Sequence, residues 1–130
     1  MTIHLNHTVV ASKDAAASAK WFAETLGLEP PLRAGPFWQV SVANGVDLDF
    51  YSGYESDDVR SQHYAFLVDE EDFDAILERI IEQDIDYFAD PQGQRCREIN
   101  HNDGGRGAYF ADPNGHWLEI LTRPYGSQVG

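Results

Sequence analysis

The sequence predicts an α+β fold built from two tandem β-α-β-β-β modules, and three observations lead to this prediction. Each half of the chain begins with a strand-like alternation of side chains, followed by apolar residues at helical spacing. Each half also ends in a predicted hairpin. Short motifs recur: LNHTVV in the first half matches SQHYAF in the second, and NGVDLDFY matches NGHWLEIL. Internal similarity of this kind indicates that one structural unit is used twice.

The first module is predicted to begin with a strand over residues 3–11. A helix follows, capped by Ser12 or Asp14 and ended by Gly27. The pair Asn44 and Gly45 is typical of a tight hairpin turn, and it lies between two predicted strands, residues 37–43 and 46–52. Residues 53–61 are polar and rich in turn formers, so we expect a linker there.

The second module repeats this order. A strand is predicted over residues 63–69, then a helix over 70–83. The apolar face of this helix is predicted to be Phe73, Ile76, Leu77, Ile80 and Ile81. A short strand over 85–89 and a loop over 90–106, with a possible strand at 95–99, lead to the final hairpin. Its strands are predicted at 107–111 and 116–122, around the turn Asp112-Pro113-Asn114-Gly115.

The length of 130 residues predicts a single domain, residues 1–130, with module one at about 1–53, module two at about 62–124 and a short C-terminal tail. The net charge of −13 opposes binding to nucleic acids and anionic membranes. A single cysteine excludes an internal disulfide. No export signal or membrane-length apolar run is recognisable, so we expect a cytoplasmic protein.

Glu119 is the unusual residue of the final strand, because Trp117, Leu118, Ile120 and Leu121 surround it in the sequence. An unpaired carboxylate is costly to bury. We therefore expect Glu119 to lie at an exposed edge, to pair with a cation or to bind a metal ion.

The repeat connects Glu119 with three other residues. His7 and His63 occupy matching places on the first strands of the two modules, and Asp49 matches Glu119 on the last strands. Nitrogen and oxygen ligands suit divalent metals such as Fe, Mn, Ni or Zn, and two histidines with one carboxylate suit Fe(II) in particular. Asp49 is the weaker candidate ligand, because its side chain is shorter and Asp47 on the same strand face suggests an acidic surface.

These residues resemble the vicinal oxygen chelate superfamily, which includes glyoxalase I, extradiol dioxygenases, fosfomycin-resistance transferases and bleomycin-binding proteins. The resemblance covers nearly the whole chain and is most specific in AYFADPNGHWLEIL. It implies that the paired modules curl into a half-open sheet around a metal site, with the helices outside. It also implies that His7, His63 and Glu119 are the metal ligands, and that Asp49 stands where glyoxalase-type members carry a fourth ligand.

Two further residues are candidates for proton transfer. Tyr109 lies ten residues before Glu119, as does a substrate-contacting tyrosine in the extradiol dioxygenases and fosfomycin-resistance enzymes that the chain resembles. The alternative is an aromatic residue that merely favours a half-buried strand. His101 lies in the loop INHNDGGRG, where it can act as an acid or base over the cavity or simply be solvated.

Substrate-binding candidates come from the scarce arginines and from strand aromatics. Arg97 and Arg106 flank His101, and either can bind a carboxylate or phosphonate, although a surface salt bridge is the commoner use. Trp38, Tyr51 and Trp117 can line an organic pocket or belong to the core.

The function that these residues predict is that of a metal-dependent enzyme acting on a small organic substrate that chelates the metal through oxygens. Its two versions are glyoxalase-type lyase or isomerase chemistry and ring cleavage by a dioxygenase. Thiol transfer to fosfomycin is disfavoured, because the chain has Val9 where those transferases carry threonine. The alternative is a metal-free protein that binds a drug or natural product and so confers antibiotic resistance. We expect a homodimer.

Overall fold

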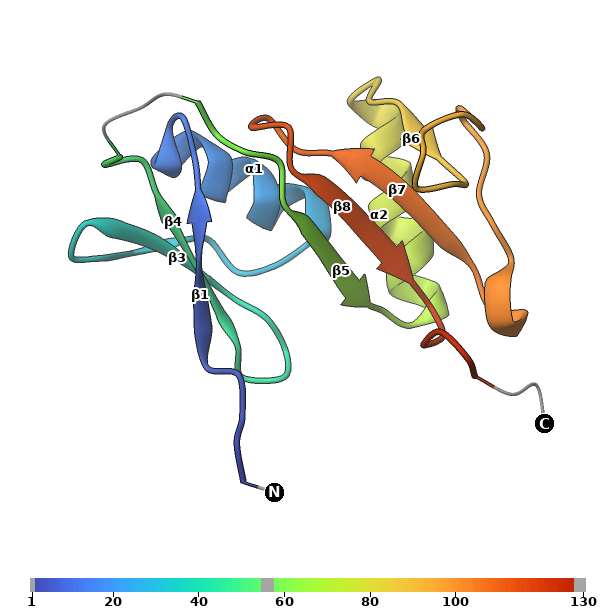
Figure 1. Ribbon diagram of the computed structural model, residues 1–130, viewed down its shortest axis with the longest axis horizontal. Helices are drawn as coiled ribbons and strands as arrows, with labels where there is room; N and C mark the ends of the chain where they lie inside the picture. Colours follow the sequence, from blue (N-terminus) through green and yellow to red (C-terminus); the bar gives the residue numbers. More distant parts are fainter. Residues whose placement is uncertain (1, 55–57, 128–130) are drawn as a thin grey trace. The chain divides into compact units, whose positions relative to one another are not determined.

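The computed structural model of the protein describes residues 2–54 and 58–127, and the backbone divides into two units with the break between Arg60 and Ser61. The first unit contains β1 (His7–Ala11), α1 (Ala15–Leu26), β2 (Leu32–Ala34), β3 (Phe37–Ser41) and β4 (Asp47–Tyr51) (Figure 1). The second contains β5 (His63–Leu67), α2 (Glu70–Glu82), β6 (Tyr87–Phe88), the 3₁₀ turn Asn102–Gly104, β7 (Gly107–Ala111) and β8 (Trp117–Leu121).

The two units have the same topology. The strand order is β1-β4-β3-β2 in the first sheet and β5-β8-β7-β6 in the second. In each sheet the first strand pairs in parallel with the last, while the other pairs are antiparallel. A parallel pair needs a long crossover, which the helix of each unit supplies. The predicted α+β fold of two β-α-β-β-β modules is thus confirmed.

Both helices begin at an aspartate. The side chain of Asp14 accepts a hydrogen bond from the backbone N–H of Ala17 at 3.1 Å, and Asp69 accepts one from Asp72 at 2.7 Å. Gly27 ends α1 with φ of 73°, a left-handed conformation that glycine adopts without strain. Among the described residues, neither helix is long and apolar enough to cross a membrane.

Side chains alternate along each strand between the two faces of the sheet. In the first unit Phe50 is buried against α1, where its ring lies 5.4 Å from that of Phe22. In the second unit the residues that face α2 are buried almost completely: Ala108, Phe110, Leu118 and Ile120. Figure 1 shows α2 lying across one side of the β5-β8-β7 sheet. The opposite face of each sheet, which no helix of its own unit covers, is called the open face below.

The strand boundaries differ from the predictions in places. β1 begins at His7 rather than at residue 3, because its partner β4 begins at Asp47, the residue opposite His7. Ile3 and Leu5 are 84% and 68% exposed. β2 was not predicted, and the possible strand at 95–99 is not formed, since Arg97 has a left-handed φ of 62°. Of the predicted linker at 53–61, residues 55–57 lie outside the described residues.

The apolar face of α2 is narrower than its sequence predicted. Ile80 is completely buried, whereas Ile81 is 48% exposed. Removal of a fully buried isoleucine side chain leaves a cavity, so Ile80→Ala is expected to lower the free energy of unfolding by about 2–5 kcal/mol. Ile81→Ala is expected to lower it by about 1 kcal/mol or less. Urea unfolding followed by circular dichroism measures both, and equal losses would contradict this assignment of faces.

Candidate metal and substrate site

The turn between β7 and β8 sets the position of the candidate site. The buried carboxylate of Asp112 accepts hydrogen bonds from the backbone N–H groups of Asn114 at 2.9 Å and His116 at 2.7 Å. Gly115 has a φ of 86°, which its missing side chain permits. His116 is fully buried, and its Nδ1 accepts a hydrogen bond from the backbone N–H of Gln62 at 3.0 Å. The turn therefore ties the start of β5 to β8.

His63 and Glu119 meet on the open face of the second sheet. His63 lies opposite Trp117 and Glu119 lies opposite Ala65, so the two residues point to the same side, two positions apart. The Nε2 atom of His63 is 3.0 Å from Oε1 of Glu119. Glu119 is only 2% exposed, while the His63 side chain is 48% exposed. The carboxylate that seemed unusual in the sequence is thus buried and paired.

The positions of the hydrogen atoms on the His63 ring show that a proton or a cation is needed between His63 and Glu119. Nδ1 of His63 is 2.8 Å from the carbonyl oxygen of Trp117, which can only accept, so Nδ1 carries a hydrogen. In a neutral ring Nε2 then bears a lone pair, directed at an anionic oxygen. That arrangement requires either a proton between Nε2 and Oε1 or a cation bound by both atoms.

A divalent metal ion fits the same geometry. Two ligand atoms about 2.1 Å from one ion and at about a right angle are about 3.0 Å apart, which is the spacing of His63 Nε2 and Glu119 Oε1. Metal-binding histidines commonly donate their other ring N–H to a carbonyl, as His63 does to Trp117. Imidazole nitrogen and carboxylate oxygen suit first-row divalent metals.

A series of hydroxyl groups ends at the other oxygen of Glu119. Tyr125 donates a hydrogen bond to Oε2 of Glu119, and its own oxygen is 2.8 Å from the hydroxyl of Tyr109. Because the single hydrogen of Tyr125 is directed at Glu119, the hydroxyl of Tyr109 donates to Tyr125. Burial is the main reason that the pKa values of both phenols are raised, so both are protonated at neutral pH.

Tyr125 is a site residue that the sequence did not reveal. It lies in the tail after β8, within the segment PYGS, where Ser127 N–H donates to the Pro124 carbonyl at 3.2 Å. Gly126, with a φ of 76°, occupies the position that favours glycine in a type II turn. The sequence does contain this turn signal, but nothing in it shows that the turn folds back to Glu119.

Aromatic rings lie beside the pair on the same open face. The ring of Tyr109 is 6.1 Å from that of His63 and stacks on that of Trp117 at an interplanar angle of 12°. Phe88 packs against Trp117 at 5.6 Å. Within residues 2–54 and 58–127, Nε1 of Trp117 is buried and has no hydrogen-bond partner. This indole N–H is therefore an unsatisfied buried donor.

His7 and Asp49 lie in the first unit, on the open face of its sheet. Val9 is the residue opposite Asp49, so His7 and Asp49 point to the same side. Oδ1 of Asp49 accepts a hydrogen bond from the side-chain amide of Gln39 at 2.9 Å, and Nδ1 of His7 is 2.7 Å from Oδ1 of Asn6. Each unit thus carries a histidine and a carboxylate on its open face. Within the described residues, no group of three or more His, Cys, Asp or Glu side chains is arranged to hold a metal ion.

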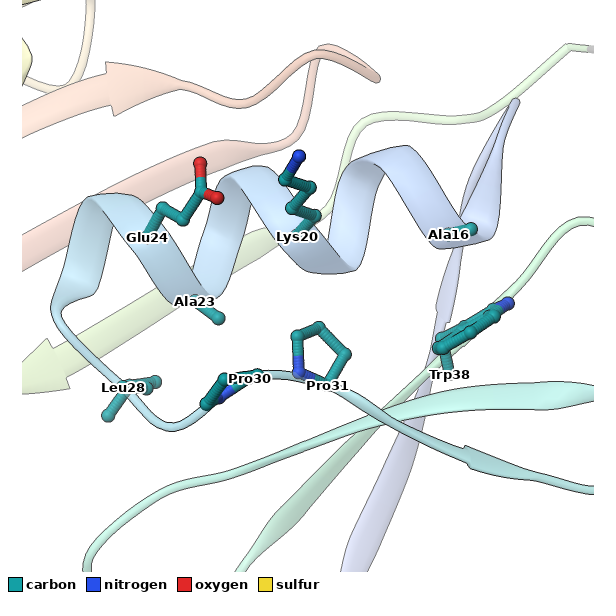
Figure 2. A pocket seen from close by; sticks show the side chains of 8 residues that line it. All are labelled: Ala16, Lys20, Ala23, Glu24, Leu28, Pro30, Pro31 and Trp38. Carbon is teal, nitrogen blue, oxygen red and sulfur yellow. The ribbon is translucent and has the colours of Figure 1, made fainter.

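The candidate aromatics of the first unit lie on opposite faces of its sheet. Tyr51 is on the face of Asp49 and packs against Phe37 at 5.4 Å. Trp38 is opposite Phe50 and therefore faces α1. There it lines a cavity of about 380 Å³ between α1 and the loop that carries two prolines (Figure 2). The other residues that line it are Ala16, Lys20, Ala23, Glu24, Leu28, Pro30 and Pro31.

Both candidate arginines are occupied by ion pairs with carboxylates. Arg97 pairs with Asp84 at 3.1 Å and with Asp86 at 2.9 Å. Arg106 pairs with Glu70 at 2.7 Å and with Asp74 at 2.8 Å, both on α2. These contacts raise the pKa of each guanidinium. Both arginines thus form surface salt bridges, the commoner of the two uses that the sequence suggested for them. His101 is exposed and lies just before the 3₁₀ turn Asn102–Gly104.

Comparisons with solved structures show close relatives of the whole chain. Oxidase ChaP-H1 is 54% identical, with a TM-score of 0.93, over 97% of this chain and 100% of that chain. Oxidase ChaP-H2 is 58% identical, with a TM-score of 0.93, over 98% of each chain.

A curated relative and a family profile agree with the fold. Glutathione transferase FosA of Serratia marcescens is 29% identical over 124 residues, which are 89% of this chain and 78% of FosA. The profile of the Glyoxalase/Bleomycin resistance protein/Dioxygenase superfamily matches residues 4–120. The repeated β-α-β-β-β units, the His63–Glu119 pair and this match lead to one conclusion: the chain belongs to the Glyoxalase/Bleomycin resistance protein/Dioxygenase superfamily.

Proposed function

We propose that the protein is a metal-dependent enzyme that oxidises a small organic molecule with O₂, and that this molecule binds through neighbouring oxygen atoms. His7, His63 and Glu119 hold a divalent metal ion, and Fe(II) is the best match to two imidazoles and one carboxylate. The observation that carries the proposal is the 3.0 Å approach of His63 Nε2 to Glu119 Oε1, with Nδ1 already bonded to a carbonyl. The two relatives named oxidases, at 54% and 58% identity, support the oxidative version.

Residues of the chain have separate roles in this proposal. The carbonyl of Trp117 fixes the ring of His63 with Nε2 towards Glu119. The stacked rings of Tyr109 and Trp117 form a flat wall beside the pair, against which an organic substrate can pack. A divalent metal held there acts as a Lewis acid and as a template for the substrate oxygens. His101 remains a predicted acid or base.

A glyoxalase-type isomerase is the second version considered, and it needs Asp49 as a fourth ligand. Asp49 has a shorter side chain than glutamate, and one of its oxygens already accepts a hydrogen bond from Gln39. Three ligands leave more positions open for substrate and O₂ than four do. We therefore favour the oxidative enzyme over the isomerase.

FosA supports a different candidate, thiol transfer to fosfomycin. Its identity of 29% is well below that of the two oxidases. Val9, which shares the open face with His7 and Asp49, offers no hydroxyl group where the transferases carry threonine. The metal-free binding protein is the remaining alternative, and the metal measurement below separates it from the enzyme. For the assembly we expect a homodimer.

Metal binding is the first test. Protein purified without chelators and reconstituted anaerobically with Fe(II) is expected to retain about one metal ion per chain by elemental analysis. His63→Ala and Glu119→Ala each remove a ligand, so affinity is expected to fall by more than the roughly 10- to 100-fold that loss of an outer hydrogen-bond partner causes. His4→Ala, a change at an exposed histidine, is the matched control. If the wild type retains no metal after reconstitution with Fe(II), Mn(II), Ni(II) or Zn(II), the metal-free binder is supported instead.

Oxygen dependence is the second test. The Fe(II)-loaded protein is expected to convert a member of a panel of catechols and related hydroxyaromatics only in air, with O₂ consumed in proportion to product. Ring cleavage by a dioxygenase incorporates both atoms of ¹⁸O₂ into the product, whereas an oxidase reaction incorporates neither. Equal turnover of thiol–aldehyde adducts with and without air would support the isomerase. Thiol addition to fosfomycin would support the transferase.

The role of Asp49 is the third test. Asp49→Asn keeps the size of the side chain and its bond partner Gln39 while removing the charge. If the metal ion has three protein ligands and Asp49 is not one of them, this variant is expected to bind Fe(II) with nearly the affinity of the wild type. Competition with a chelator measures this affinity. A loss as large as that of Glu119→Ala would show that Asp49 is a ligand and would favour the isomerase.

A further inference from the structure

Tyr125 is held in place by its hydroxyl group rather than by burial of its ring. The residue is 60% exposed, so little apolar area is removed from water. Its hydroxyl, in contrast, makes two hydrogen bonds on the open face of the second sheet, one to Glu119 and one to Tyr109. An aromatic ring left at the surface with its polar end directed at a buried carboxylate indicates that the polar contact determines its position.

The tail around Tyr125 is anchored on both sides of the contact. The PYGS turn is closed by two hydrogen bonds to the Pro124 carbonyl, from the N–H of Ser127 at 3.2 Å and from its hydroxyl at 2.5 Å. The N–H of Gly126 donates to Oδ1 of Asp103, in the 3₁₀ turn before β7, at 3.1 Å. The tail is therefore attached to the body of its unit, and it presents Tyr125 to Glu119 from a defined position.

The two oxygens of Glu119 have different partners. Oε1 faces Nε2 of His63 at 3.0 Å, and Oε2 accepts the hydrogen of Tyr125. Tyr109, which donates to the oxygen of Tyr125, makes that hydroxyl a stronger donor. The hydrogen bond from Tyr125 uses one lone pair of Oε2 and draws electron density from that oxygen, so Oε1 is the better ligand atom for a metal ion.

We propose that Tyr125 is a positioning residue of the metal site: its hydroxyl holds Oε2 of Glu119 so that the carboxylate binds the metal through Oε1 alone. This proposal rests on the proposed function. With Glu119 as a one-oxygen ligand beside the two proposed histidine ligands, a six-coordinate ion would retain three positions for substrate and O₂. If Glu119 bound through both oxygens, one of these positions would be lost.

Tyr125→Phe tests the proposal, because it removes one oxygen atom from a mostly exposed ring. The probe is Co²⁺ alone, added to the full-length protein. The affinity of Tyr125→Phe is expected to be roughly 10- to 100-fold lower than that of the wild type, as for other outer hydrogen-bond partners of metal ligands. The visible absorption of the bound Co²⁺ is also expected to change in intensity, since this intensity depends on coordination number.

Two matched variants separate positioning from a general effect. Tyr109→Phe leaves the bond from Tyr125 to Glu119 in place, so its loss of affinity is expected to be smaller than that of Tyr125→Phe. Tyr87→Phe changes a tyrosine of β6 that is opposite Phe110 and so faces α2, and no change is expected. Thermal unfolding of the metal-free proteins measures the separate cost of the lost hydrogen bonds, and Co²⁺ affinity is compared at a temperature where every variant is fully folded.

Each contrary outcome has a separate meaning. If Tyr125→Phe binds Co²⁺ with the affinity and spectrum of the wild type, the positioning role is wrong while the proposed function stands. If the loss of Co²⁺ affinity disappears at a temperature where Tyr125→Phe is as fully folded as the wild type, Tyr125 is structural and the positioning role is again wrong. If the wild type binds neither Co²⁺ nor any of the other divalent metals, both the positioning role and the proposed function are wrong.

Discussion

The parallel pairing of the first and last strand in each unit is the constraint on which the rest of the structure depends. It requires a crossover, so a helix follows the first strand and covers one face of the sheet. It also aligns β5 with β8, so that His63 and Glu119 point to the same open face. A slip of one residue in this register would turn Glu119 towards α2 and into the core. Fold and candidate site are therefore set by the same hydrogen bonds.

Much of the fold could be predicted from the sequence because local signals agree with the tertiary structure. Asp14 and Gly27 begin and end α1 as predicted, and Gly115 permits the turn before β8. The errors arise where a strand depends on a distant partner. β1 begins only where β4 offers a residue to pair with, and the stretch around Arg97 does not extend, because Arg97 takes a left-handed conformation while its side chain pairs with Asp84 and Asp86.

The candidate site was predictable to the extent that the repeat reveals it. Matching positions in two modules identified His63 and Glu119, and the structure brings these two together. The contact with Tyr125 could not be predicted, because it depends on where a turn beyond the last strand folds back. The ion-pair partners of Arg106 could not be predicted either, because Glu70 and Asp74 are more than thirty residues away along the chain. The alternation of side chains along a strand predicts which face of the sheet a residue occupies, but it does not predict which distant side chains that residue contacts.

Each sheet is completed by strands of its own unit, and the break between the units falls between strands rather than within a sheet. A gene of half the length would thus encode an entire sheet with its helix, which makes duplication and fusion of one ancestral unit a simple origin for this chain. After such a fusion, a substitution in one copy leaves the backbone ladder of the other intact. The two copies are therefore free to diverge, and they have done so. Asp49 accepts a hydrogen bond from Gln39 on a neighbouring strand, whereas Glu119 accepts one from Tyr125 in the tail.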